Sequence, residues 1–144
     1  SLSADSEHKS GIAEFATGGL SSKNYRDLLM DFANNNEALR DAGAGGLAYG
    51  IDQFFQSKED KTNPHLAFSD STQNGFVTIE ATNQELIATY HMIAGKLATE
   101  DLTEQELATE FSSERFRVVA GSHGLQSYRD DTWKTWSPEQ LDWV

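Results

Sequence analysis

Two carboxylates and an imidazole lie close together near the start of the chain, at Asp5, Glu7 and His8. Carboxylate oxygens and imidazole nitrogens are ligands for iron, zinc, manganese and calcium, so these three side chains are candidate metal ligands. A polar loop of this composition is more often a solvated turn. The residues by themselves therefore leave two interpretations open, and the solvated turn is the simpler one.

A second imidazole, His65, follows Asn63 and Pro64. Proline, asparagine and a polar neighbour are typical of a turn, in which Asn63 and His65 brace the backbone. A contact with phosphate or metal is the alternative for His65, and we favour the structural turn. We expect His91 to be a partly buried structural histidine in a strand, whereas His123 lies in a glycine-containing turn from which no role follows.

A predicted hairpin follows the Asn63–His65 segment and would position it. Residues 76–80 alternate with period two, which predicts a strand with Val77 and Ile79 on its buried face. Residues 82–85 make the connection, and residues 86–93 return as a second strand. This second strand has apolar residues on both sides, which predicts that both of its faces are covered. They are Ile87, Tyr90, Met92 and Ile93.

Other elements are predicted before the hairpin. Residues 12–17 alternate like a strand, and residues 18–22 are turn-forming. Apolar residues at helical spacing from Tyr25 to Phe32 predict a helix that ends near residues 34–36. Glycine-rich residues 43–46 predict a packed loop, since a phosphate-binding loop would need a Lys-Ser or Lys-Thr pair that is missing there.

Further elements are predicted after the hairpin. Thr103 and Glu106 have the spacing of a capping box, which predicts the start of a short helix. Residues 115–120 alternate like a strand. Ser137 followed by Pro138 is typical of a second helix start, with a capping hydroxyl and a proline in the first turn.

Length and composition bound the class of protein. A chain of 144 residues is enough for one domain. The formal net charge of −12 repels nucleic acids, so we expect no nucleic acid as a partner. Without cysteine, neither a disulfide framework nor a thiolate metal site can form within the chain. No apolar run reaches the length of a membrane span.

Several segments together resemble the late part of PhoD-like alkaline phosphatases, in the metallophosphatase superfamily. Residues 3–8 resemble a Ser-Gly-Asp-x-His motif at a strand end, and residues 13–18 are similar to the Val-Glu-Phe strand that follows it. Residues 63–65 and 75–77 resemble the closing hairpin of the family, with its Asn-Pro-His and Gly-Phe-Val sequences. Residues 116–118 look like the last strand.

The resemblance extends over residues 3–119 and implies a fold. It implies an α+β protein: the C-terminal part of an αββα metallophosphatase-like sandwich, with mostly antiparallel strands and two or three short helices. Residues 1–144 would then be a single, incomplete domain of a larger phosphatase. The N-terminal portion, or a companion chain of the same enzyme, would be the partner. The chain begins without methionine, which agrees with that expectation.

The resemblance also implies a site. Asp5, Glu7 and His8 would contribute to a metal centre shared with the N-terminal portion, in which iron, calcium or zinc lowers the pKa of a bound nucleophile and holds the phosphoryl oxygens. His65 would be a substrate contact. Ala4 replaces the family glycine and one extra residue separates Asp5 from His8, so either His8 takes the histidine position across a bulge or Glu7 occupies it.

The implied function is hydrolysis of phosphate esters by a periplasmic or extracellular enzyme. The Gly-Asn-His type segment expected earlier in that family does not occur in these 144 residues, so we expect no activity from this chain alone. A non-catalytic binding or structural relative is the alternative. Such a relative would keep the hairpin and lose the metal site, as Ala4 and the displaced His8 allow.

Overall fold

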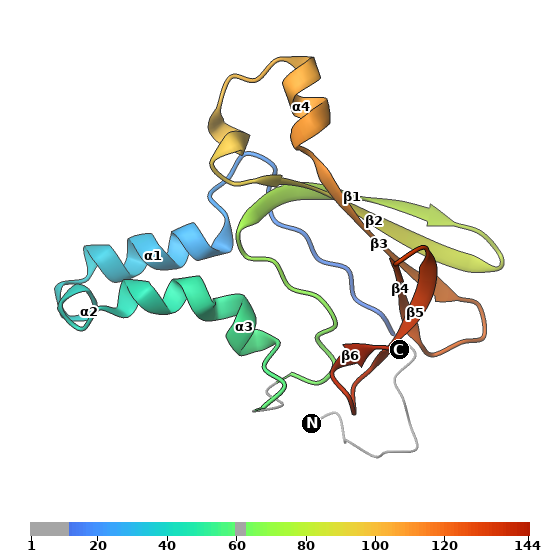
Figure 1. Ribbon diagram of the computed structural model, residues 1–144. Helices are drawn as coiled ribbons and strands as arrows, with labels where there is room; N and C mark the ends of the chain where they lie inside the picture. The colour runs from blue at the N-terminus through green and yellow to red at the C-terminus, as the bar shows by residue number, and fades with distance from the viewer. Residues whose placement is uncertain (1–11, 60–62) are drawn as a thin grey trace.

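The structure of the protein is a computed structural model, of which residues 12–59 and 63–144 are described. These residues form a six-stranded sheet with strand order β1-β2-β3-β4-β5-β6, and a group of helices lies beside one end of it (Figure 1). Every neighbouring pair of strands is antiparallel, so the sheet is a meander. The predicted α+β class with mostly antiparallel strands is confirmed.

The strands are long at one edge of the sheet and short at the other. β1 (Gln73–Ala81) and β2 (Glu85–Ala94) form a hairpin, which continues through a helical excursion into β3 (Ser112–Val119). The chain then ends in three shorter strands. They are β4 (Leu125–Arg129), β5 (Thr132–Ser137) and β6 (Asp142–Trp143).

The predicted hairpin is confirmed, but its burial differs from the prediction. Ile79 pairs with Ala88 and is 48% exposed, whereas we expected it on a buried face. The second half of β1 is exposed because it extends away from the elements that cover the rest of the sheet (Figure 1). In β2, Met92 and Ile93 are both buried although they point to opposite faces, so both faces are covered at that end.

An aromatic core lies on one face of the sheet. Phe116 is 1% exposed, and its ring centroid lies 5.4 Å from that of Phe68, 5.7 Å from Tyr90 and 5.9 Å from Trp143. Phe68 belongs to the segment that precedes β1, so this segment covers the core from outside the sheet. Burial of large aromatic side chains is the main stabilising contribution at this face.

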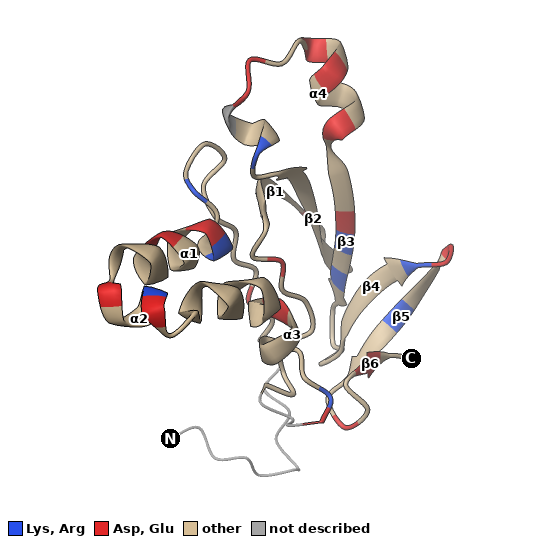
Figure 2. Cartoon of the chain, turned by 60° about the vertical axis from the view of Figure 1, so that its left-hand side comes forward, with Lys and Arg blue, Asp and Glu red and all other residues tan. Residues whose placement is uncertain are grey.

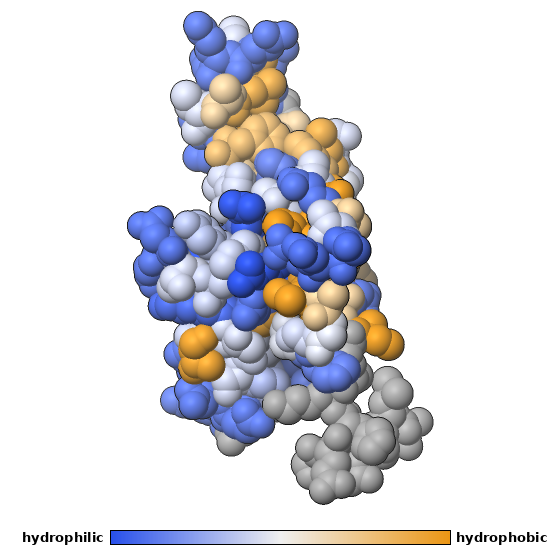
Figure 3. Space-filling view, turned by 90° about the vertical axis from the view of Figure 1, so that its right-hand side faces the viewer, coloured by the Kyte–Doolittle hydropathy of each residue, from blue (hydrophilic) through white to orange (hydrophobic). Residues whose placement is uncertain are grey.

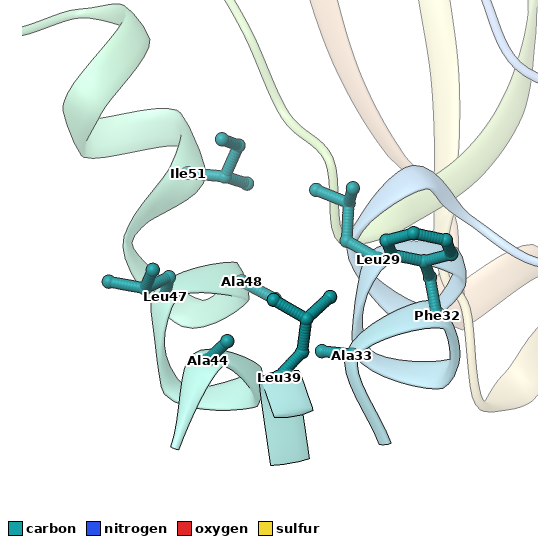
Figure 4. A pocket seen from close by; sticks show the side chains of 8 residues that line it. All are labelled: Leu29, Phe32, Ala33, Leu39, Ala44, Leu47, Ala48 and Ile51. Atoms are coloured by element: carbon teal, nitrogen blue, oxygen red, sulfur yellow. The ribbon is translucent and has the colours of Figure 1, made fainter. Parts of the chain in front are cut away.

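The helical group follows the pattern expected from its caps. The side chain of Asn24 accepts a hydrogen bond of 2.8 Å from the Asp27 amide, and the helix that begins there ends at Asn35, as predicted. Apolar side chains of this group line a shallow groove between its first helix and the glycine-rich segment (Figure 4). The elements are α1 (Tyr25–Asn35), α2 (Glu37–Asp41), the 3-10 helix η1 (Ala44–Gly50) and α3 (Ile51–Phe55).

The excursion between β2 and β3 contains the 3-10 helix η2 (Leu97–Thr99) and α4 (Glu104–Glu110). The predicted capping box is confirmed, because the Thr103 amide donates to the Glu106 carboxylate at 2.9 Å and the Glu106 amide donates to the Thr103 hydroxyl at 3.3 Å. Figure 2 shows that acidic residues recur along α4. Among the helices of the described residues, none combines the length and apolar character needed to cross a membrane.

Three local predictions need correction. Residues 12–17 are not a strand, because they form no ladder with another strand of the described part. Residues 44–50 form η1, which starts after Gly43 at a positive φ of 70°, where we expected a loop. No helix starts at Ser137. Its hydroxyl does accept from the Gln140 amide at 3.2 Å, but the positive φ of 50° at Leu141 ends the turn and β6 follows.

Candidate functional site

The predicted metal ligands Asp5, Glu7 and His8 lie outside the described residues. Within residues 12–59 and 63–144, no group of three or more His, Cys, Asp or Glu side chains is arranged to hold a metal ion. The metal site therefore stays a prediction from the sequence.

The segment Asn63–His65 forms a turn that braces the structure. The Leu66 amide donates to the Asn63 carbonyl at 3.0 Å, and Trp136 of β5 donates its indole N–H to the Pro64 carbonyl at 2.9 Å. The His65 side chain is exposed beside these contacts. The expected turn is confirmed, but its bracing contacts are those of the Asn63 and Pro64 carbonyls, and the His65 side chain has no hydrogen bond within the described part of the chain. A contact between His65 and substrate stays a prediction.

A set of polar side chains, which we call the polar junction, lies where the chain before α1, the helical group and the start of the sheet meet. Asn24 and Asn74 are 6% and 3% exposed, so these two amides are nearly removed from water. Buried polar groups are costly unless they are hydrogen-bonded, which makes their partners informative. The members are Asn24, Asp52, Asp70 and Asn74.

The two asparagines of the polar junction join segments that are distant in sequence. Asn24, the cap of α1, also donates its side-chain amide to the Thr72 carbonyl at 3.0 Å, just before β1. Asn74 in β1 donates its side-chain amide to the carbonyl oxygens of Gly19, at 2.8 Å, and Ser22. The chain before α1 is thus fixed against the sheet by side-chain amides.

Asp52 fixes the helical group to the same place. Its carboxylate accepts hydrogen bonds from the Ser69 hydroxyl at 2.7 Å, the Ser71 hydroxyl at 2.7 Å and the Ser71 amide at 2.9 Å. Hydrogen bonds to a charged group are stronger than neutral ones. Because these donors occupy both oxygens, Asp52 has a positioning role and is a poor candidate for a general base or a metal ligand.

The surroundings of Asp70, a further member of the polar junction, lower the pKa of its carboxyl group. Burial raises the pKa of Asp70, but hydrogen bonds from Thr72 and Gln73 outweigh burial and hold the pKa below its usual value of 3.8. The carboxylate accepts from the Thr72 amide at 2.8 Å, the Thr72 hydroxyl at 2.7 Å and the Gln73 side-chain amide at 2.6 Å. The ionised carboxylate is therefore favoured in the folded protein.

This shift predicts a pH dependence of stability. The hydrogen bonds to the ionised Asp70 carboxylate stabilise the fold at pH values above its pKa in the unfolded chain, about 4. This contribution is lost as the pH falls through the lower pKa of Asp70 in the folded protein. Asp70→Asn should flatten the decrease of the unfolding free energy below about pH 4, measured by urea unfolding at several pH values. Thr72→Val keeps the carboxylate but removes one donor, so it should flatten the decrease only in part. An unchanged slope in Asp70→Asn would contradict the assignment.

Arginines and aromatic rings gather on the sheet face opposite the aromatic core. The guanidinium of Arg117 lies 4.3 Å from the centroid of the Trp133 ring and 3.3 Å from the Glu85 carboxylate. Arg115 lies 5.7 Å from the Tyr128 ring and 5.8 Å from the Trp133 ring, and it has no carboxylate partner among the described residues. Cation–π contacts orient a guanidinium without neutralising its charge. Arg115 is therefore available to an anion.

This arginine and aromatic surface was not foreseen from the sequence. The alternation of Arg115 and Arg117 around Phe116 places both cations on the face away from the core. The rings come from β4 and β5, whose pairing sets Tyr128 opposite Trp133. The sequence signal was the alternation of side chains between the two faces of β3, β4 and β5. It shows that the arginines and the rings share one face only when the register of the three strands is known.

The chain matches no protein-family model, no curated protein and no solved structure. The resemblance to PhoD-like phosphatases therefore rests on the sequence motifs alone. The described residues offer three features: a buried, hydrogen-bonded junction that holds the chain before α1, an exposed His65 in a braced turn, and the exposed guanidinium of Arg115 on the outer face of the sheet.

Proposed function

We propose that this chain is the C-terminal portion of a metal-dependent PhoD-like phosphatase or phosphodiesterase, with the αββα sandwich of the metallophosphatases. One observation supports the proposal most directly. Two of the motifs that resemble the family, residues 13–18 and 75–77, are distant in sequence but lie close together, because Asn74, directly before the second motif, donates to the carbonyl oxygens of Gly19 and Ser22, which follow the first. The chain that leads from the Asp5–His8 segment is thus attached to the closing hairpin.

In this proposal the described residues form a scaffold, and the metal ligands come from residues 5–8 and from the N-terminal portion of the enzyme. Asp5, Glu7 and His8 offer the carboxylate and imidazole donors that suit iron, calcium or zinc. Such an ion, shared with the N-terminal portion, would lower the pKa of the nucleophile and hold the phosphoryl oxygens. His65 is exposed beside the braced turn, where it would contact the phosphate ester. The enzyme would be periplasmic or extracellular.

The proposal is tested on the native polypeptide that contains this chain. Elemental analysis should find stoichiometric iron, calcium or zinc, and p-nitrophenyl phosphate or its bis ester should be hydrolysed. His8→Ala should lower the metal content and reduce the rate of hydrolysis by about 100-fold or more. Removing a metal ligand lowers activity at least as much as removing a residue that only hydrogen-bonds to a ligand. His123→Ala, in a turn, is the matched control. A protein without metal and without hydrolysis overturns the proposal.

A non-catalytic binding relative is the second candidate, and one observation favours it. Arg115 is exposed, is stacked against two rings and has no carboxylate partner among the described residues. Such a guanidinium offers planar donors to an oxyanion. If metal and hydrolysis are absent, inorganic phosphate should still bind, and Arg115→Ala should abolish that binding while Arg115→Lys weakens it. Calorimetric titration measures both, and unchanged binding in Arg115→Ala excludes this surface.

A further inference from the structure

The outer edge of β1 has backbone groups that point away from the sheet. β1 is the first strand in the order and pairs only with β2. The Thr82 amide donates to the Glu85 carbonyl at 2.9 Å, so these two residues form the hydrogen-bonded pair that closes the hairpin. Hydrogen-bonded and non-hydrogen-bonded pairs alternate along an antiparallel ladder. The amides and carbonyls that face outward are therefore those of Gly75, Val77, Ile79 and Ala81.

An independent contact supports this assignment. The Thr17 hydroxyl donates to the Gly75 carbonyl at 3.4 Å, which requires that carbonyl to point away from β2. Beyond Gly75 the edge is open. Within the described part of the chain, the outward amides and carbonyls of Val77, Ile79 and Ala81 have no hydrogen-bond partner.

This edge lacks the features that keep strand edges apart. Exposed edges are usually protected by lysine, proline, a bulge or a very short strand. β1 has nine residues without Lys, Arg or Pro, and Glu80 is its one charged residue. Phe76 and Ile79 are 42% and 48% exposed along it. Figure 3 views the molecule from the side toward which the hairpin extends and shows apolar residues at the surface between polar ones.

The opposite edge of the sheet does not offer a matching strand. β6 at that edge has two residues, Asp142 and Trp143. A head-to-tail contact between β1 and β6 would therefore form few hydrogen bonds. A contact of β1 with β1 of another copy uses the same long edge twice and closes on itself, as a two-fold interface does.

We propose that the outer edge of β1 pairs with β1 of a second copy of this chain, antiparallel about a two-fold axis at Ile79. In this register Ile79 faces Ile79 of the second copy, and Val77 faces Ala81. Glu80 faces Thr78, so no two carboxylates lie opposite each other. The register also leaves Gly75, which already accepts from Thr17, outside the pairing.

The proposed β1–β1 interface is small, so the dimer that it forms is weak. It consists of main-chain hydrogen bonds along one strand edge, together with burial of the two Ile79 side chains. A standard stable interface buries about 800 Å² on each partner, more than a single strand edge provides. The dimer is therefore reversible and depends on concentration. This inference does not rest on the proposed phosphatase function.

Single cysteines test the pairing and its register, since the chain contains no natural cysteine. Facing Cα atoms in a hydrogen-bonded antiparallel pair lie about 5.5 Å apart, within reach of a disulfide or a short thiol cross-linker. Ile79→Cys should give covalent dimers on a non-reducing gel. Val77→Cys is the matched control, because the two copies of residue 77 are offset by four residues along the strands and lie about 14 Å apart in this register. Cross-linking at residue 77 and none at residue 79 overturns the register.

Charge at the same position tests the dimer without covalent chemistry. Ile79→Lys sets two ammonium groups against each other at the axis, and sedimentation should show a monomer at concentrations where the wild type is dimeric. Ile79→Thr keeps a β-branched residue without charge and should still dimerise. The side chain is half exposed, so both variants should unfold at temperatures close to that of the wild type. A wild type that is monomeric at every concentration, or a dimer unaffected by Ile79→Lys, overturns the proposal.

Discussion

Phe116→Ala is expected to lower the free energy of unfolding by about 3–5 kcal/mol, as truncation of a buried phenylalanine typically does. Phe116 is 1% exposed, and its ring lies against those of Phe68, Tyr90 and Trp143. These rings come from the segment before β1, from β2 and from β6. The cavity would therefore weaken contacts among three parts of the fold at once.

Urea unfolding followed by tryptophan fluorescence measures this loss, because Trp143 is one of the neighbouring rings. Phe32→Ala is the matched control. It makes the same chemical change in α1, where the side chain is 65% exposed, and should cost less than about 1 kcal/mol. Equal losses in the two variants would contradict the placement of the core at Phe116.

Gly75→Ala is expected to lower stability by about 3 kcal/mol, at the upper end for overpacking. A Cβ at this position would overlap the carbonyl oxygen of His91 and lie 3.1 Å from its carbonyl carbon and 3.2 Å from the Cα of Met92. These are backbone atoms of β2, which cannot rotate away as a side chain could. The strands would have to separate at the point where Asn74 holds the chain before α1.

Thermal unfolding with a matched glycine variant measures this effect. Gly46→Ala places a Cβ where no heavy atom lies within 4 Å, and the residue has no positive φ. That substitution should be neutral or stabilising by up to about 1 kcal/mol, because alanine loses less backbone entropy on folding than glycine. If Gly75→Ala unfolds at the same temperature as Gly46→Ala, the close approach of β1 and β2 is incorrect.

The elements that could be predicted from the sequence are those whose stabilising interactions join residues close together in the chain. The Asn24 cap of α1 and the capping box of Thr103 and Glu106 are made by residues three positions apart, so the sequence contains the whole interaction. The alternation in β1 and β2 likewise predicts which side chains share a face. Burial was less predictable, because the exposure of Ile79 depends on how far the covering elements extend.

The failed predictions show where local signals are not sufficient. Ser137 accepts the hydrogen bond from the Gln140 amide that a helix cap would accept, yet β5 and β6 pair around it and the backbone turns back at Leu141. The pairing of β5 with β6 therefore takes the place of the helix that we expected after Ser137. Residues 12–17 have the alternation of a strand but do not enter the ladder of the sheet.

The candidate site was the least predictable part. The polar junction depends on contacts such as that of Asn74 with Gly19, which are 55 residues apart, and no spacing rule anticipates them. Arg115 becomes a candidate anion contact only when strand pairing places it near Tyr128 and Trp133. The metal ligands Asp5, Glu7 and His8 stay predictions from sequence, as does the role of His65.

The meander order of the sheet has a consequence for folding kinetics. Each strand pairs with the next one along the chain, so most sheet contacts close short loops, and folding is fast when contacts are local. The sheet can grow one hairpin at a time. The contacts that bridge long stretches, such as Trp136 with Pro64 and Lys58 with Asp142, join the end of the chain to its middle. We expect these to form last, after the strands have aligned.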